Sequence, residues 1–347
     1  MLPLVITNYR NDFDQFDRNI KRSGTNQPEE RQEKIYNKLV GKYPIYVPNI
    51  ELTKNIIIGL NAHDYYYLTF LEKAYETFLE NPDKDYLKPD GIIPYHFSRR
   101  KSFQSNHNSA YWKQIGYYCD DVMTPINSDT YKISMESANN CYVAVNMLKL
   151  YDCIYCLNTY PGHHAMFAGY GGYCYLNNAY ICAKALVVQD YKVAVLDLDY
   201  HAGNGIQEIL ILTENYNNIL SVSIHADPKY EYPTFSGFLY ENTNNHHNII
   251  FAKKASWIEY KICLDRALTM INKFNPDVII VPFGGDTYKD DKDASELYGC
   301  SLELDDYVKM GNEINKLKKK VIVTQEGGYC MDMMPKIIDN LLEGLTS

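Results

Sequence analysis

KVAVLDLDYHAGNGIQEI, residues 192–209, joins an apolar run to a polar turn and then to an amphipathic segment. A run that is apolar on both faces is typical of a strand in a parallel sheet that helices cover on both sides. The turn carries Asp197, Asp199, His201 and Asn204 directly after the strand. Ligands of open α/β sheets bind beyond the carboxyl ends of the strands, so we look for chemistry first in this turn.

Strands and helices alternate along the rest of the chain. The apolar periodicity predicts strands over 192–198, 219–224, 277–283 and 320–325, and helices over 131–150, 174–190, 205–210, 257–274 and 303–318, with a last helix at the end of the chain. No linker divides the 347 residues. We therefore predict one α/β domain over residues 1–347, a doubly wound and mostly parallel sheet with helices on both faces, with a loop insertion over 95–114.

The overall charge bears on the kind of partner. The formal net charge of −9 disfavours direct nucleic-acid binding and favours cationic substrates. No apolar run approaches the length of a membrane span, and the N-terminal MLPLVIT is too short for the core of a signal peptide and is expected to form a first strand. We expect an intracellular protein, cytoplasmic rather than membrane-bound, and the sequence does not distinguish the cytoplasm from the nucleus.

The nine cysteines are scattered through apolar segments, a pattern typical of reduced thiols in a cytosol-like compartment. Cys153 and Cys156 form a CxxC pair. No second pair is present to complete a tetrahedral zinc site, and the surrounding residues are strand-like and apolar. We interpret this pair as structural.

Several predicted strands end in ionisable residues that could form a metal site. Asp199 and His201 would project to the same face if the strand continued that far, and Asp286, after another strand, could complete three ligands. One imidazole and two carboxylates leave coordination positions open, which suits a catalytic zinc or a ferrous iron. In the competing interpretation the aspartates cap helices or turns and His201 is a satisfied core residue.

The adjacent histidines His163 and His164 lie in a glycine-rich segment after an earlier apolar run. Metal-activated water needs a base to accept its proton, and this pair fits that role. Asp197 could bind one imidazole and raise its pKa, and Asn204 could bind the other and leave it neutral. Tyr329 follows two glycines and could donate a hydrogen bond to the developing oxyanion.

These blocks together resemble the arginase–deacetylase superfamily, and within it the acetylpolyamine amidohydrolases and other histone-deacetylase-like amidohydrolases. The matching blocks are PGHHA (161–165), GGYCYLNNA (171–179), VAVLDLDYHAGNGIQEI (193–209), SIHADPKYEYPTFSG (223–237), DTYKDD (286–291), EGGY (326–329), and also PEERQEKI (28–35), AHDYYYLTFLEKA (62–74) and GYYCDDVMTPI (116–126). Asn204 is usual in the amidohydrolase branch, where many histone deacetylases have aspartate.

The resemblance implies a role for each matching residue. It implies Zn²⁺ held by Asp199, His201 and Asp286. It further implies that His164 is the general base and acid and that His163, paired with Asp197, is an electrostatic partner. Tyr329 would be the phenol that polarises the amide carbonyl. The implied tunnel walls are Gly172, Tyr173 and Tyr232. A K⁺ site is also implied, formed by main-chain oxygens of Asp197, Asp199 and His201 together with Ser223 and Ile224.

We therefore expect a zinc-dependent amidohydrolase that removes acetyl or a similar acyl group from a polyamine or from a protein lysine. The net charge and an acidic rim at Asp290, Asp291 and Asp293 favour the small cationic amine over an acetyl-lysine peptide. One alternative is an arginase-like two-manganese hydrolase, although the extra ligands for it are missing from the motifs. Another is a non-catalytic module that binds acyl-lysine or a partner. The 95–114 insertion could cap the tunnel or join two subunits in a homodimer.

Overall fold

The computed structural model describes residues 1–9, 28–98, 109–213 and 218–347. Its main sheet contains the strands β1 (Leu4–Thr7), β2 (Ile45–Tyr46), β5 (Cys153–Leu157), β6 (Val193–Asp197), β7 (Ile219–His225), β8 (His246–Ile250), β9 (Val278–Phe283) and β10 (Lys320–Gln325). Their spatial order is β2-β1-β5-β10-β9-β6-β7-β8, and every neighbouring pair is parallel. A separate antiparallel ribbon pairs β3 (Leu87–Lys88) with β4 (Gly91–Ile92).

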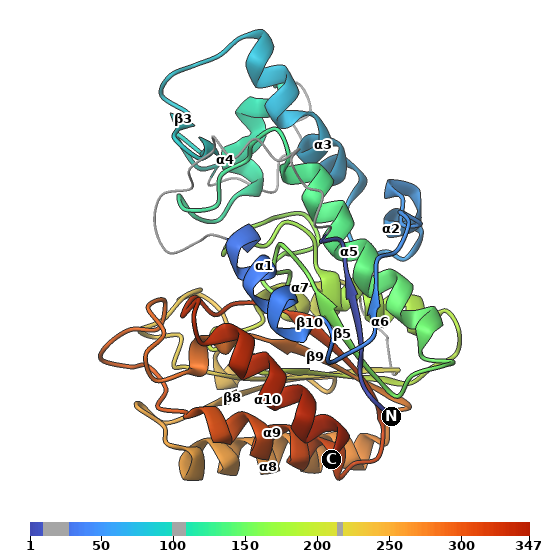
Figure 1. Cartoon of the computed structure of the whole chain (residues 1–347). Coiled ribbons are helices and arrows are strands. Elements are labelled where there is room, and N and C mark those ends of the chain that lie inside the picture. Colours follow the sequence, from blue (N-terminus) through green and yellow to red (C-terminus); the bar gives the residue numbers. More distant parts are fainter. Residues whose placement is uncertain (10–27, 99–108, 214–217) are drawn as a thin grey trace.

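Helices cover both faces of the sheet (Figure 1). The helices are α1 (Pro28–Leu39), α2 (Lys54–Gly59), α3 (Tyr65–Glu80), α4 (Ile115–Tyr118), α5 (Thr130–Met147), α6 (Asn178–Val187), α7 (Asn204–Leu212), α8 (Trp257–Phe274), α9 (Leu304–Asn315) and α10 (Met334–Thr346). One buried apolar layer contains residues of α3, α5, α6 and α7, and the layer on the other face contains residues of α1, α8, α9 and α10. The predicted doubly wound α/β fold is confirmed.

From residue 130 onward the element boundaries agree closely with the sequence pattern, with two exceptions, whereas α1–α4 and β2–β4 were not predicted. The helix expected from residue 174 begins only at Asn178, because Asn177 caps it by accepting the Tyr180 N–H at 3.0 Å. Strand β8 was not predicted, since its apolar residues follow the polar segment 241–248 and do not alternate. The strand nevertheless forms because the buried strand β7 offers a free edge, and residues 246–250 pair with that edge.

Cys153 and Cys156 lie on the buried strand β5. Residues three apart on a strand point to opposite faces, and these two cysteines belong to opposite apolar layers. They cannot share a ligand, and all nine cysteines are free thiols. The structural interpretation of the CxxC pair is confirmed.

The segment 95–114 lies only partly within the described residues, because 99–108 fall outside them. Its end is not a plain surface loop: Tyr111–Gln114 form a 3-10 helix in which Trp112 is buried. The indole packs edge-on against Phe78 and Tyr86, with ring centroids 5.6 and 5.0 Å from that of Trp112, respectively.

In the described part of the chain, no helix combines the length and apolar character needed to span a bilayer.

Candidate active site

The site lies where the adjacent strands β5, β10, β9 and β6 end. The loop after β5 carries the histidine doublet, the loop after β6 carries Asp199 and His201, the turn after β9 carries Asp286, and the loop after β10 carries Tyr329. Parallel strands present all their carboxyl ends at one edge, so these loops meet there. A cavity of about 170 Å³ is lined by His163, His164, Asp199, His201, Asp286 and Tyr329, among others.

Asp199 and His201 converge through a loop rather than along a strand. The condition that the strand continues as far as His201 is not met, because β6 ends at Asp197. Instead, Asp199 Oδ1 accepts the His201 main-chain N–H at 2.9 Å, which folds the backbone back on itself. His201 Nδ1 then lies 3.2 Å from Asp199 Oδ1 and 3.2 Å from Asp286 Oδ2. The three predicted ligands therefore meet at one point.

These three side chains fit a divalent cation. All are buried, and one possible ligand atom from each lies within 4.8 Å of the other two. Apart from His201 Nδ1 at 3.2 Å, the buried Asp286 Oδ2 has no hydrogen-bond partner among the described residues. A buried carboxylate oxygen of this kind is costly unless a cation or donor satisfies it. The capping interpretation explains only the other oxygens, which accept the Tyr200 N–H at 3.0 Å and the Gly327 N–H at 2.8 Å.

Two glycines leave room around the carboxylates. A Cβ on Gly284 would lie 2.0 Å from Asp199 Oδ2, and one on Gly327 would lie 2.5 Å from Asp286 Oδ2.

Burial, followed by the charge of Asp199, raises the pKa of Asp286 to about 8. A cation held between these groups would oppose both effects and lower that pKa.

The two adjacent histidines have different partners and opposite pKa shifts. His163 Nδ1 lies 3.2 Å from Asp197 Oδ2, and although burial lowers the pKa of His163, the Asp199 and Asp197 charges raise it to about 10. His164 Nδ1 lies 2.7 Å from Asn204 Oδ1, and burial holds the pKa of His164 well below its ordinary value. His163 is therefore charged at neutral pH and His164 is neutral. The predicted pairing of an acid with one histidine and an amide with the other is confirmed.

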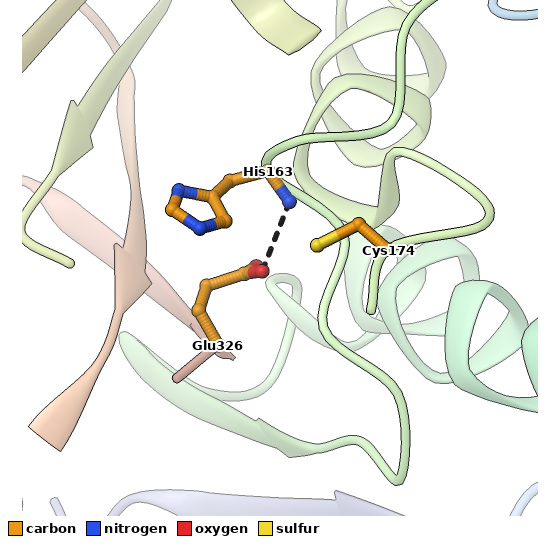
Figure 2. A group of neighbouring side chains, drawn as sticks. All are labelled: His163, Cys174 and Glu326. Atoms are coloured by element: carbon orange, nitrogen blue, oxygen red, sulfur yellow. Dashed lines mark hydrogen bonds between the residues drawn. The ribbon is translucent and has the colours of Figure 1, made fainter. Parts of the chain in front are cut away.

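Glu326 holds the histidine loop in place, a role that the sequence analysis missed. Its Oε2 accepts the main-chain N–H groups of Gly162, at 2.5 Å, and His163, at 3.0 Å, and its Oε1 accepts the Thr324 hydroxyl at 2.8 Å. Figure 2 shows the bond to His163 and, beside it, the Cys174 thiol. The position of Glu326 directly after β10 was the available signal.

His163, Cys174 and Glu326 also lie close enough to share an ion. The Glu326 oxygens, however, already accept hydrogen bonds from the backbone and from a hydroxyl. Burial raises the pKa of the Cys174 thiol well above its ordinary value, so it stays protonated, and its sulfur lies 3.4 Å from the Gly172 carbonyl. We interpret this group as a hydrogen-bonded scaffold and not as a second metal centre.

Tyr329 is buried at the wall of the cavity. Asp291 Oδ2 accepts the main-chain N–H of Tyr329 at 2.6 Å, and the Arg31 guanidinium lies 5.5 Å from the centre of the phenol ring and donates to the Gly328 carbonyl at 3.3 Å. The rim prediction is therefore wrong for Asp291, whose carboxylate is buried and positions Tyr329. Asp290 is exposed and does not line the cavity, whereas Asp293 does.

Gly172, Tyr173 and Tyr232 all line the same cavity, as predicted. Gly172 and Tyr173 both have positive φ angles, of 53° and 66°, a backbone conformation that is unfavourable for tyrosine. The Asp121 carboxylate accepts the Gly172 N–H at 2.7 Å, and the Thr124 hydroxyl accepts the Tyr173 N–H at 3.0 Å. These two bonds hold the strained turn to the segment 121–124.

The residues predicted to bind potassium lie beside the metal site. In the β6–β7 register Ser223 is opposite Asp197, and Ile224 follows it on the buried strand β7. The Ser223 hydroxyl accepts the Gly203 N–H at 3.2 Å and lies 2.9 Å from His225 Nδ1. The site therefore has the predicted neighbours, and the ion itself stays a prediction.

The family model described as the histone deacetylase domain matches residues 27–345. The chain belongs to this family. Among its members, Acetylpolyamine amidohydrolase 1 of Pseudomonas aeruginosa is 32% identical over 302 residues, covering 82% of this chain and 81% of the relative. Acetylpolyamine amidohydrolase 2 of the same organism is also 32% identical, covering 78% of this chain and 80% of the relative.

Solved structures of the histone deacetylase family have the same fold. The crystal structure of acetylpolyamine aminohydrolase from Burkholderia pseudomallei superposes with a TM-score of 0.84 at 26% identity, covering 99% of both chains. The family is one of deacetylases and amidohydrolases, so the chain belongs among hydrolases that act on amides.

Proposed function

We propose that this member of the histone deacetylase domain family is a zinc-dependent amidohydrolase that removes acetyl or similar acyl groups from small cationic amines. The observation that carries the proposal is the convergence of Asp199, His201 and Asp286 in one cavity with a neutral and a charged histidine. These three residues would hold Zn²⁺. When bound, the ion would supply a Lewis acid for the amide carbonyl and activate water at neutral pH.

The protein's own groups then have distinct tasks. His164 is neutral and its Nδ1 faces Asn204, so its Nε2 is the atom that would accept the proton of the attacking water and later deliver it to the leaving amine. His163 stays charged beside Asp197 and would stabilise negative charge. Burial raises the pKa of Tyr329 well above its ordinary value, so the phenol stays protonated and would donate a hydrogen bond to the carbonyl oxygen.

Three observations support a small acylated amine as the substrate. The relatives that the chain matches are named acetylpolyamine amidohydrolases. The cavity is narrow, at about 170 Å³, and tyrosines 173 and 232 form part of its wall, where they can contact a methylene chain or a cation. Asp293 lines it with a carboxylate that favours a positive charge. A protein acetyl-lysine is the other substrate that this chemistry allows.

The test is an assay of the zinc-loaded protein with acetylputrescine and with an acetyl-lysine peptide. We expect turnover of acetylputrescine with the higher kcat/KM, and a loss of at least a hundredfold in His164→Ala, the usual order for removing a general base. Turnover of neither substrate, with His164→Ala indistinguishable from wild type, would contradict the proposal. Metal analysis separates the alternatives: one zinc per chain supports it, whereas two manganese ions would favour an arginase-like hydrolase.

The accompanying proposals are a K⁺ ion beside Ser223 and Ile224, one domain over residues 1–347, and a homodimer joined through the 95–114 region. The nine free cysteines support a reducing compartment such as the cytoplasm. Sedimentation of the purified chain tests the oligomeric state, and activity in sodium against potassium salts tests the second ion.

A further inference from the structure

Glu231 is a buried acid that the mechanism above does not use. It precedes Tyr232 in the loop after β7 and lines the same cavity as the metal ligands. Only 7% of the residue is exposed, and its Oε1 atom is buried without a hydrogen bond of ordinary geometry among the described residues, although the Ser295 and Tyr200 side chains lie next to the carboxylate. An unsatisfied carboxylate oxygen in such a place lowers stability unless a ligand satisfies it.

The charges around Glu231 show which kind of ligand would satisfy it. Among the residues that the structure describes, the cavity lining contains four acids and no lysine or arginine. Asp199 and Asp286 belong to the metal site, which leaves Glu231 and Asp293 to face the remaining space. No described lysine or arginine forms an ion pair with either of these two. Burial raises the pKa of Glu231, hydrogen bonds from Ser295 and Tyr200 and the charge of His201 lower it, and the charge of Asp293 raises it. An added cation would stabilise both carboxylates.

We propose that the Glu231 carboxylate, together with Asp293, binds the free ammonium group of an acylated diamine or polyamine and is a specificity-determining residue of this site. The inference rests on the proposed function, in which the acyl amide is held at the metal end of the cavity. The rest of the substrate then extends along Tyr173 and Tyr232, and its second amine meets the two carboxylates. A charge-assisted hydrogen bond to Glu231 would select cationic over neutral chains.

A different interpretation is that Glu231 serves only the structure. The Tyr200 and Ser295 side chains are its polar neighbours, and hydrogen bonds from both of them lower the pKa of Glu231. If Glu231 acted only through Tyr200, the variants Tyr200→Phe and Glu231→Gln would impair all substrates to a similar degree. Discrimination between a charged and a neutral substrate of the same shape is the property that only ammonium binding predicts.

The experiment compares acetylputrescine with N-pentylacetamide, in which a methyl group replaces the ammonium. We expect wild type to prefer acetylputrescine and Glu231→Gln to reduce the ratio of the two kcat/KM values by about tenfold or more, the effect of one lost charge-assisted hydrogen bond. Asp293→Asn should reduce the same ratio. The matched control is Glu296→Gln, which alters an exposed acid nearby that does not line the cavity and should keep the ratio.

Putrescine binding to the zinc-loaded protein, measured by calorimetry, is an independent readout. We expect Glu231→Gln to weaken it by about tenfold or more. An unchanged substrate ratio together with unchanged putrescine affinity in folded Glu231→Gln would overturn the inference and leave the proposed function standing. Absence of amidase activity in wild type, with putrescine binding that depends on Glu231, would instead overturn the proposed function and support the ammonium site.

Discussion

The side-chain oxygen of Asn204 lies 2.7 Å from Nδ1 of His164, whereas the equivalent partner of His163 is the carboxylate of Asp197. An amide and a carboxylate can both orient an imidazole, but the charged carboxylate stabilises the protonated ring more strongly than the neutral amide does. The site therefore separates the two histidines into a neutral group and a charged one, although their ring centroids are only 3.9 Å apart. Burial and the neighbouring charges of His163 and His201 keep His164 neutral, and Asn204 adds no negative charge that would oppose them. Asn204 can be exchanged for aspartate with little change in size.

Asn204→Asp should shift the acidic limb of the pH profile of kcat/KM to higher pH. The new charge stabilises protonated His164 and raises its pKa from the low value that burial imposes. The base must be neutral to act, so activity is lost at a higher pH than in wild type. Rates measured between pH 5 and pH 9 on acetylputrescine provide the check. A limb that stays in place would show that His164 does not titrate as the base.

The metal-free protein should lose stability as pH rises. The folded-state pKa of Asp286 is about 8, well above that of an unfolded aspartate, so the folded state binds the extra proton between these values. The stability that this extra proton gives the folded state is fully present below about pH 4, the approximate pKa of an unfolded aspartate. It is lost as pH rises through the folded-state pKa of Asp286. Thermal unfolding in chelator should show this decline, and Asp286→Asn, which cannot titrate, should flatten it. The same slope in both proteins would contradict the assignment.

Gly284→Ala should reduce metal binding. Its Cβ would lie 2.0 Å from Asp199 Oδ2 and 2.5 Å from Asp286 Oδ1, so the carboxylates must move apart. We expect less than one bound ion per chain after dialysis, with kcat reduced in proportion. The matched control is Gly59→Ala at the end of α2, where nothing lies within 4 Å of the added carbon. That variant should keep its metal and its activity, and a loss of metal in both would point to a general effect on folding.

Glu326→Gln should impair both stability and activity. The carboxyl group accepts two main-chain N–H groups of the histidine loop and the Thr324 hydroxyl, burial raises its pKa to about 7, and leaving one buried donor unsatisfied costs about 1–3 kcal/mol. We expect the free energy of unfolding in urea to fall by about 2 kcal/mol and kcat to fall about tenfold as His163 and His164 shift.

Thr324→Val is the control for Glu326, because it removes only the hydroxyl donor. It should cost about 1 kcal/mol in urea unfolding, with a smaller effect on kcat. If Glu326→Gln unfolds at the same urea concentration as wild type and keeps its kcat, Glu326 does not hold the loop.

Gly172→Ala should reduce activity more than stability. Gly172 has a φ of +53°, and an added Cβ would lie 2.3 Å from Cδ2 of His164, the ring that acts as base. We expect kcat to fall about a hundredfold while KM changes little, since misplacing a catalytic group by about 1 Å costs that much. Steady-state kinetics with acetylputrescine tests this. A change confined to KM would indicate that the turn only contacts substrate.

Much of the fold and of the metal site followed from local pattern. Continuous apolar runs such as 192–198 and 277–283 are a direct consequence of burial on both faces of a parallel sheet. The ionisable residues lie immediately after these runs, so their meeting at one edge could be inferred before the strand order was known. Strand β8 escaped prediction because its formation depends on the edge that β7 offers, and not on its own periodicity.

The sequence alone determined the α/β class, and it singled out Asp199, His201 and Asp286 as candidate ligands and His163 and His164 as candidates for proton transfer, because these follow from chain order and side-chain chemistry. Tertiary structure alone decided which acid faces which group. Asp290, Asp291, Asp293 and Glu231 are chemically similar, yet one is exposed, one supports Tyr329 and two line the cavity. The physical reason is that burial and hydrogen-bond partners are set by loops brought together from distant parts of the chain, and these contacts leave no local pattern.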